Sequence, residues 1–224
     1  MDIFAAMNLN TVIFDMDGLL IDSEPLWKEA ADEIFKGYGM QLTRQQYIAT
    51  TGLRTKEFLS FWFKYFKIPP ENIADAEKKI VESVIDLVVK KGKPMPGVSH
   101  IFNFFTDRNF NIGLASSSGL ALINVVVELL DIRKNLLAIT SAENLAFGKP
   151  HPEVYLNCAE KLAVSPDQCI CFEDSFNGMI AVKAAKMKCV IVPSLPDNNN
   201  LVWHAADLKI STLHNFNQLL LNSL

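Results

Sequence analysis

The chain has 224 residues, of which half are hydrophobic and 21% are charged, so it can bury a sizeable core and is not expected to be disordered. Its formal net charge of −4 provides no general attraction for nucleic acid or an anionic membrane, and neither partner is expected. The length fits one large domain, or a medium domain with a smaller companion.

The N-terminus and the cysteines both favour the cytoplasm. Residues 1–10 contain no basic region followed by a long apolar stretch, so no secretion signal is predicted, and no apolar run is long enough to span a membrane. The four cysteines match no zinc pattern and are expected to be buried free thiols; they are Cys158, Cys169, Cys171 and Cys189. We expect a cytoplasmic protein, and a monomer, since nothing in the sequence demands a partner chain.

The first predicted element is a short buried strand, Thr11–Phe14, and a long helical stretch follows it. This stretch contains no convincing second strand. Its predicted helices are Glu24–Lys36, Thr43–Ala49, Thr55–Tyr65 and Asn72–Lys90. Residues 91–97 then carry two glycines and two prolines, which is typical of a linker. We therefore expect a small helical cap domain at 24–91, inserted after strand one of a core domain at 1–23 and 92–224.

After the linker, short apolar runs alternate with segments of helical spacing. The runs are Ile112–Ala115, Leu136–Thr140, Cys169–Phe172, Cys189–Val192 and Leu208–Ile210. Continuous apolar runs of this length are typical of strands that are buried on both faces of a parallel sheet. Strand followed by helix, repeated along the chain, predicts an α/β fold with a doubly wound parallel sheet.

Polar side chains follow the ends of several predicted strands. They are Asp15 and Asp17, then Ser116 and Ser117, then Lys149, and finally Glu173 and Asp174. Ligands of open parallel sheets bind beyond the carboxyl ends of the strands, where these groups would converge. Each alone could be a turn or helix-cap residue. Together, four carboxylates would repel one another unless a cation were bound, and an all-oxygen set favours Mg²⁺.

This set of groups suits phosphoryl transfer. A bound Mg²⁺ and a lysine would neutralise charge on the phosphoryl oxygens, and a serine hydroxyl would donate to one of them. One carboxylate could attack phosphorus and form a covalent intermediate. A second could act as acid toward the leaving oxygen and as base toward water.

At these residues the sequence resembles the haloacid dehalogenase superfamily through all four of its motifs. They are Phe14–Gly18, Leu114–Ser116, Gly148–Pro152 and Phe172–Ser175. The resemblance implies a Rossmann-like core with a cap after strand one. It makes Asp15 the nucleophile, Asp17 the acid/base, and Ser116 and Lys149 the phosphoryl contacts, with Ser117 beside them. It gives Mg²⁺ the ligands Asp15, Asp17 through its carbonyl, and Asp174, with Glu173 either a ligand or a carboxylate behind the ligands.

Within that superfamily the chain looks like the bacterial 2-deoxyglucose-6-phosphate and hexitol phosphatases. The stretches that carry this likeness are Phe14–Trp27 and Glu173–Ile180. The resemblance implies a Mg²⁺-dependent hydrolase of a small sugar or sugar-alcohol phosphate. Trp27 and Arg54 are the candidate cap contacts to the substrate; core packing and a surface cation are their alternatives.

Three rival functions share the scaffold. A β-phosphoglucomutase-like isomerase has the same motifs, but such mutases carry a histidine where this chain has Trp27, and an aromatic residue is not expected to make the equivalent hydrogen bond. Dehalogenases of the superfamily lack the acid that corresponds to Asp17. A non-catalytic sugar-phosphate sensor would usually have lost a motif residue, and none is missing here. Hydrolysis is therefore the favoured function.

Overall fold

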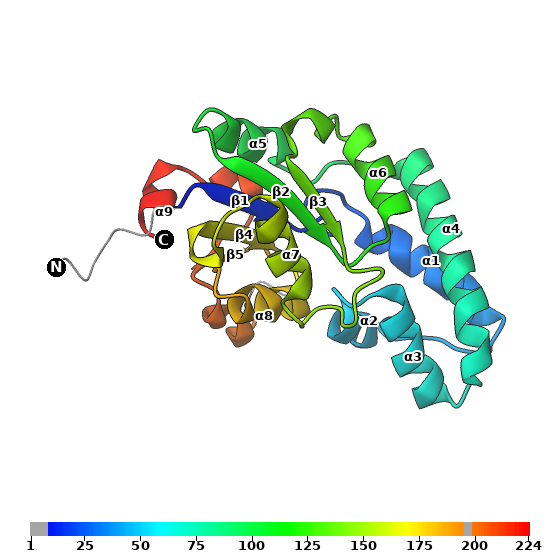
Figure 1. The fold of residues 1–224 in the computed structure, drawn as a ribbon. Helices are drawn as coiled ribbons and strands as arrows, with labels where there is room; N and C mark the ends of the chain where they lie inside the picture. Colours follow the sequence, from blue (N-terminus) through cyan, green and yellow to red (C-terminus); the bar gives the residue numbers. More distant parts are fainter. Residues whose placement is uncertain (1–8, 195–198) are drawn as a thin grey trace.

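The computed structural model describes residues 9–194 and 199–224 (Figure 1). The first eight residues of the predicted core segment 1–23 lie outside the described part. Its strands are β1 Thr11–Phe14, β2 Asn111–Ser116, β3 Ala138–Ser141, β4 Cys169–Glu173, β5 Lys188–Ile191 and β6 Leu208–Lys209. Its α-helices are α1 Glu24–Lys36, α2 Arg44–Thr50, α3 Thr55–Phe66, α4 Ile73–Lys91, α5 Val98–Thr106, α6 Leu120–Leu129, α7 Glu153–Lys161, α8 Phe176–Ala184 and α9 Gln218–Asn222.

All six strands lie in one parallel sheet of order β3-β2-β1-β4-β5-β6. The chain order reverses at β1, so the carboxyl ends of β1, β2 and β4 lie side by side there. This confirms the predicted doubly wound sheet. β3 starts at Ala138 instead of Leu136, because a 3₁₀ turn, Arg133–Asn135, occupies the residues before it.

Alternate residues of the central strands enter two separate cores, one on each face of the sheet. Val12 and Phe14 of β1 lie in the core that includes α5 and α6, whereas Ile13 lies in the core that includes α7 and α8. Phe172 packs against Phe14 with ring centroids 5.2 Å apart. The continuous apolar runs of the sequence are thus explained by burial on both faces.

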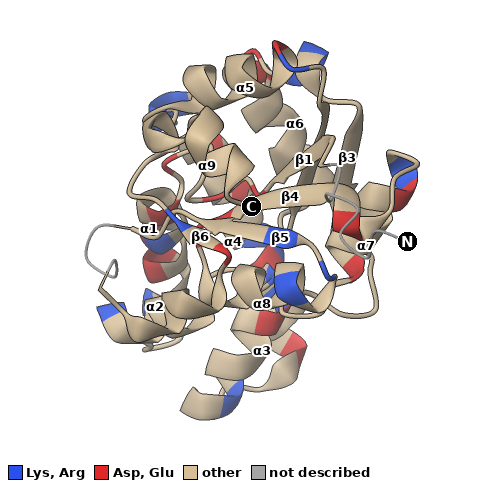
Figure 2. Ribbon diagram, turned by 90° about the vertical axis from the view of Figure 1, so that its left-hand side faces the viewer, with Lys and Arg blue, Asp and Glu red and all other residues tan. Residues whose placement is uncertain are grey.

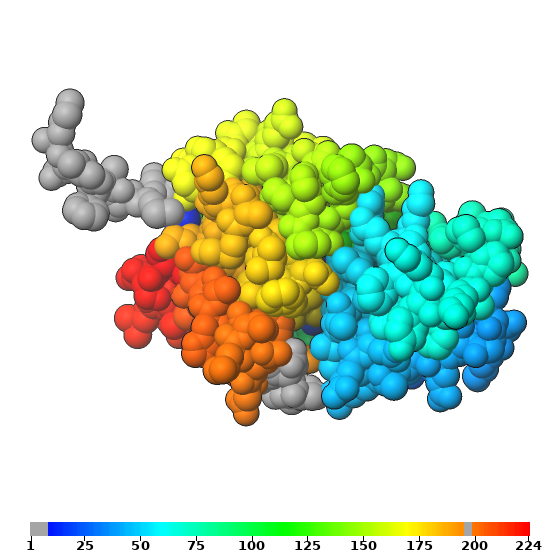
Figure 3. Space-filling view, turned by 90° about the horizontal axis from the view of Figure 1, so that it is seen from below, coloured from blue at the N-terminus to red at the C-terminus, as the bar shows by residue number. Residues whose placement is uncertain are grey.

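The helical segment α1 to α4, called the cap below, lies between β1 and α5 in the chain and extends to one side of the sheet (Figure 1). Helix α4 buries Ala76, Ile80, Val84 and Val88, which recur every fourth residue and form one apolar face. Thr43 and Gln46 form a capping box at the start of α2. In the space-filling view, the blue and cyan cap abuts the core (Figure 3). The domain boundaries 24 and 91 stay a prediction.

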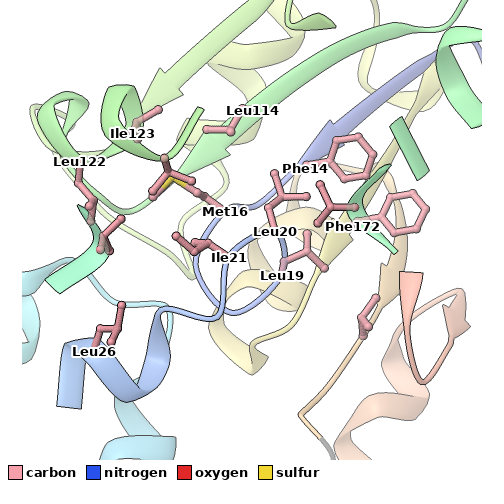
Figure 4. Close-up of a cluster of buried hydrophobic side chains, with 14 of the residues drawn as sticks. Phe14, Met16, Leu19, Leu20, Ile21, Leu26, Leu114, Leu122, Ile123 and Phe172 are labelled. Carbon is pink, nitrogen blue, oxygen red and sulfur yellow. The ribbon is translucent and has the colours of Figure 1, made fainter. Parts of the chain in front are cut away.

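The loop after β1 is anchored by four buried apolar side chains, Met16, Leu19, Leu20 and Ile21. Figure 4 shows them among Phe14, Leu114, Ile123 and Phe172. Asp15 and Asp17 lie on either side of the buried Met16 in the same loop. The loop is therefore held rigidly where its carboxylates can act.

Charged residues are interspersed along the elements in the view of Figure 2, without one face of a single sign. Among the described residues, no helix is both long and apolar enough to cross a bilayer.

Candidate active site

A cavity of about 500 Å³ lies between the cap and the carboxyl edge of the sheet. Its core wall includes Asp15, Asp17, Ser116, Ser117, Lys149 and Asp174, and its cap wall includes Trp27, Tyr47 and Phe58. The structure thus brings the sequence-predicted polar groups together at one site. Glu173 and Arg54 do not line this cavity.

Lys149 lies at the floor of the site and bridges two carboxylates. Its Nζ donates to Asp15 Oδ1 over 2.5 Å and to Glu173 Oε1 over 2.6 Å. All three side chains are almost fully buried. Burial alone would lower the pKa of Lys149, but Asp15 and Glu173 raise it above its usual range, so the side chain stays an ammonium.

Glu173, the last residue of β4, is surrounded by hydrogen-bond donors. Oε1 accepts from Lys149 and from the hydroxyl of Tyr155 at 2.6 Å. Oε2 accepts from the backbone N–H groups of Asp174 and Ser175 and from the Ser175 hydroxyl. Although burial opposes it, Lys149 and these donors hold the pKa of Glu173 below its usual range.

Tyr155 is a residue that sequence reasoning missed. It lies in α7, is fully buried, and places its ring 4.9 Å from the ammonium of Lys149. Its position, three residues after Pro152 in a predicted helix, indicated only packing. A tyrosine among the buried apolar residues of that helix was the one available signal, because a buried hydroxyl needs a partner.

Asp174 differs from its neighbour Glu173 in its hydrogen bonding. Its carboxylate has no hydrogen-bond partner among the described residues. It lies against Gly18, where a Cβ would collide with Oδ2, and Gly18 has φ +74°, so a glycine fits this position. Carboxylate oxygens of Asp15, Glu173 and Asp174 all lie within 4.8 Å of one another, close enough to hold a metal ion.

The acidic cluster has more negative charge than Lys149 can balance. Burial, then the charges of Glu173 and Asp17, raise the pKa of Asp15 from 3.8 to about 8 against the opposing pull of Lys149. Burial, Glu173 and Asp15 likewise raise the pKa of Asp174 well above its usual range. Without a further cation, the site therefore favours protonated carboxyl groups.

Asp17 is held by three donors at the mouth of the cavity. Oδ1 accepts from the Ser23 hydroxyl at 2.7 Å and from the indole Nε1 of Trp27 at 2.9 Å, and Oδ2 accepts from the Ser118 hydroxyl at 2.7 Å. The expectation that an aromatic residue at position 27 makes no such hydrogen bond was wrong. The indole does donate; it cannot accept a proton. Ser23 and Ser118 were also missed.

Ser116, the last residue of β2, and Ser117, which follows it, have separate partners. Ser116, which is buried, accepts from the backbone N–H of Ser118. Ser117 donates to the carbonyl of Gly52 in the cap over 2.7 Å. The hydroxyl of Ser117 is therefore engaged with the cap in this arrangement, although the residue lines the cavity.

Arg54 differs from its predicted role as a substrate contact. Its Nη1 donates to the carbonyl oxygens of Ala142 and Leu145, and its Nη2 pairs with Glu57. The guanidinium thus points toward the core loop after β3, away from the cavity. The sequence could not indicate this, because the acceptors lie 88 and 91 residues away.

The family model described as haloacid dehalogenase-like hydrolase matches residues 12–192. Hexitol phosphatase B of Escherichia coli K12 is 38% identical over 202 residues, which cover 90% of this chain and 91% of that protein. Fructose-1-phosphate phosphatase YqaB of the same organism is 31% identical, with 81% of this chain and 95% of that protein covered.

Solved structures show the same fold. CbbY from Rhodobacter sphaeroides in complex with phosphate has a TM-score of 0.85 at 22% identity, covering 96% of this chain and all of that one. β-Phosphoglucomutase from Clostridium difficile has a TM-score of 0.84 at 24% identity, with 95% of each chain covered. Because the family model matches residues 12–192 and hexitol phosphatase B is 38% identical, the chain belongs to the haloacid dehalogenase-like hydrolase family.

Proposed function

We propose that this protein is a phosphatase that hydrolyses a small sugar or sugar-alcohol phosphate through a phospho-aspartate on Asp15. The observation that carries the proposal is the pairing of Lys149 Nζ with Asp15 Oδ1 at 2.5 Å on the floor of the cavity. A phosphoryl group placed there would meet a carboxylate nucleophile and an ammonium together. Ser116, at the end of the neighbouring strand, supports a further contact to the phosphoryl oxygens.

Two displacement steps follow from the positions of the carboxylates. In the first, a carboxylate oxygen of Asp15 attacks phosphorus, the bond to the leaving oxygen breaks, and Asp17 gives that oxygen a proton. In the second, a water molecule attacks the phosphorus of phospho-Asp15, Asp17 takes the water proton, and the acyl-phosphate bond breaks. Inorganic phosphate and the sugar alcohol leave, and both carboxylates return to their starting state.

A divalent cation fits the acidic cluster, and we assign it as Mg²⁺ because the available donors are all oxygen. Asp15, the backbone carbonyl of Asp17 and the carboxylate of Asp174, for which the described residues provide no hydrogen-bond donor, would hold it. Glu173 has five donors on its two oxygens, so we assign it to the orientation of Lys149. When bound, Mg²⁺ would neutralise charge on the phosphoryl oxygens.

The cavity and the relatives support a compact polyhydroxy substrate. A volume of about 500 Å³ suits a molecule of hexose-phosphate size. The cap wall offers the aromatic rings of Trp27, Tyr47 and Phe58. Aromatic rings can pack against the C–H faces of a sugar. Relatives named for hexitol and fructose 1-phosphate agree with this class.

We also propose, as the sequence led us to expect, that the protein is a cytoplasmic monomer with a cap domain at 24–91 and that it binds no nucleic acid or membrane.

The test is a turnover screen over hexose, pentose and polyol phosphates with Mg²⁺ and after chelation, with β-glucose 1-phosphate isomerisation followed in parallel. We expect release of inorganic phosphate that needs Mg²⁺ and is abolished in Asp15→Asn, because an amide cannot attack phosphorus. Isomerisation that outpaces phosphate release would assign the protein to the mutases instead. Full activity after chelation would remove the metal from the mechanism.

A further inference from the structure

The cap reaches into the core through Arg54, at the N-terminus of α3. Its Nη1 donates to the carbonyl oxygens of Ala142 at 3.0 Å and Leu145 at 2.6 Å. The side chain is only 14% exposed. Charge-assisted hydrogen bonds to two backbone carbonyls order a loop more firmly than neutral ones do. Arg54 therefore holds the first half of the core loop that runs from β3 to Lys149.

Glu57, one turn along α3, holds the second half of the same loop. Its Oε1 accepts from Nη2 of Arg54 at 2.6 Å and from the backbone N–H of Gly148 at 3.1 Å. Gly148 directly precedes Lys149. We call Arg54 and Glu57 the clamp.

Gly148 is fitted to the clamp. A Cβ at this position would lie 2.8 Å from Nε of Arg54 and would collide with Oε2 of Glu57. The close approach therefore requires a residue without a side chain, which the glycine supplies. Nε of Arg54 is buried without a hydrogen-bond partner among the described residues. An unpaired buried donor costs free energy, so the clamp is held less firmly than its hydrogen bonds alone would suggest.

Two further contacts join the cap to the core beside the clamp. Ser117 donates to Gly52, and Asn177 Nδ2 donates to the carbonyl of Thr51 over 2.8 Å. The cap segment 51–57 thus touches three core segments that lie within three residues of the predicted site residues Ser116, Lys149 and Asp174. Among these contacts, only those of the clamp bind the segment that leads into Lys149.

We propose that Arg54 and Glu57 are positioning residues for Lys149. By fixing residues 142–148 when the cap lies against the core, they set the ammonium of Lys149 where it meets Asp15 and the phosphoryl group. The ammonium of Lys149 therefore reaches its catalytic position only when the cap lies against the core. The proposal rests on the proposed function in that Lys149 contacts the phosphoryl group. It also reassigns Arg54 from recognition of the sugar to support of the catalytic loop.

The test compares Arg54→Met and Glu57→Ala with wild type on two substrates that share only the phosphoryl group, a hexitol phosphate and 4-nitrophenyl phosphate. We expect kcat to fall by about tenfold or more on both substrates, with KM for the hexitol phosphate changed by less than about threefold. Inhibition by orthovanadate should weaken in parallel, because it reports on the phosphoryl site alone. The kcat of the double variant should be no lower than that of the less active single variant, since both residues hold one loop.

The matched controls are Arg133→Met and Glu128→Ala, which break an exposed Arg–Glu pair elsewhere on the core. They should leave kcat, KM and the inhibition by orthovanadate unchanged. Circular dichroism and melting temperature establish that each variant is folded; if Arg54→Met is not, Glu57→Ala carries the same test.

A rise in KM for the hexitol phosphate with unchanged turnover of 4-nitrophenyl phosphate would overturn the proposal and make Arg54 a sugar contact. Unchanged kinetics on both substrates would also overturn it. If wild type cleaves 4-nitrophenyl phosphate but no sugar phosphate, the proposed substrate class fails, while the kinetics on 4-nitrophenyl phosphate still decide this inference.

Discussion

The indole Nε1–H of Trp27 donates to Oδ1 of Asp17 over 2.9 Å, so the first helix of the cap holds the predicted acid/base of the core. Ser23 donates to the same oxygen, and Ser118 donates to Oδ2. An indole N–H can only donate, whereas a serine hydroxyl can reverse and accept. The proton that Asp17 carries as an acid therefore belongs on Oδ2, opposite Ser118.

Replacing Trp27 with phenylalanine should lower kcat on an alkyl phosphate by about tenfold, because Asp17 loses a donor that orients it for proton transfer. The loss should be smaller on 4-nitrophenyl phosphate, whose leaving oxygen needs little protonation. The measurement is kcat on both substrates, with Trp62→Phe as the control, since Trp62 donates its indole N–H to Thr50 within the cap. An unchanged kcat on the alkyl phosphate would mean that Trp27 only packs.

Replacing Tyr155 with phenylalanine should lower kcat by about tenfold, because Glu173 Oε1 then keeps Lys149 as its one donor and the ammonium is less firmly placed. A hydrogen bond to a charged group is worth about 1.5–3 kcal/mol, enough for a tenfold change. The Mg²⁺ concentration for half-maximal activity should stay within about twofold if Glu173 serves Lys149. Tyr65→Phe, at an exposed cap position, is the control. A large shift in Mg²⁺ requirement would place Glu173 among the metal ligands.

The sheet and its carboxyl-edge groups were predictable because the signals are local. A strand that is buried on both faces has a continuous apolar run, and the residue after it, such as Asp15 or Ser116, must lie at the carboxyl edge. The hydrogen bonds between cap and core were not predictable. Arg54 and its carbonyl acceptors are far apart in sequence, and backbone carbonyls leave no mark in it.

Hydrogen-bonded partners behind the catalytic groups escaped the sequence for a related reason. Tyr155 and Ser118 have the spacing of ordinary helix and loop residues, and only the folded chain shows that their hydroxyls reach Glu173 and Asp17. The difference between Glu173 and Asp174 was equally hidden. Two adjacent carboxylates look alike in sequence, yet one is saturated with donors and the other has none among the described residues.

This difference predicts unequal effects on metal binding. Asp174→Asn should weaken Mg²⁺ binding by about a hundredfold or more, because an unpaired carboxylate is the natural ligand for a hard cation. Glu173→Gln should weaken it by less than about tenfold, within the range of a residue behind the ligands. Isothermal titration with Mg²⁺ measures both, and circular dichroism checks that each variant is folded. Comparable losses in the two variants would contradict the assignment of Glu173 to Lys149.

The raised pKa of Asp15 predicts how metal binding depends on pH. In the metal-free protein, burial raises this pKa from 3.8 to about 8, so between these values the folded state binds a proton that the unfolded chain has lost. Stability of the metal-free protein should therefore fall as pH rises through this window. A cation must displace the proton of Asp15, and burial together with Glu173 and Asp15 raises the pKa of the second ligand, Asp174, as well, so Mg²⁺ affinity should rise by about tenfold or more for each pH unit below 8.

Titration calorimetry from pH 6 to pH 9 in buffers of different ionisation enthalpy measures both the affinity and the protons released. Thermal melts with and without Mg²⁺ should show a metal-dependent rise in melting temperature that is larger at pH 8 than at pH 6, because the competing proton is weaker there. Lys149 remains an ammonium throughout, since its pKa is raised above its usual range, and contributes no change. If Mg²⁺ affinity is the same at pH 6 and pH 8 and no proton is released, Asp15 is already ionised in the metal-free protein. Lys149 alone would then suffice to keep its carboxylate charged.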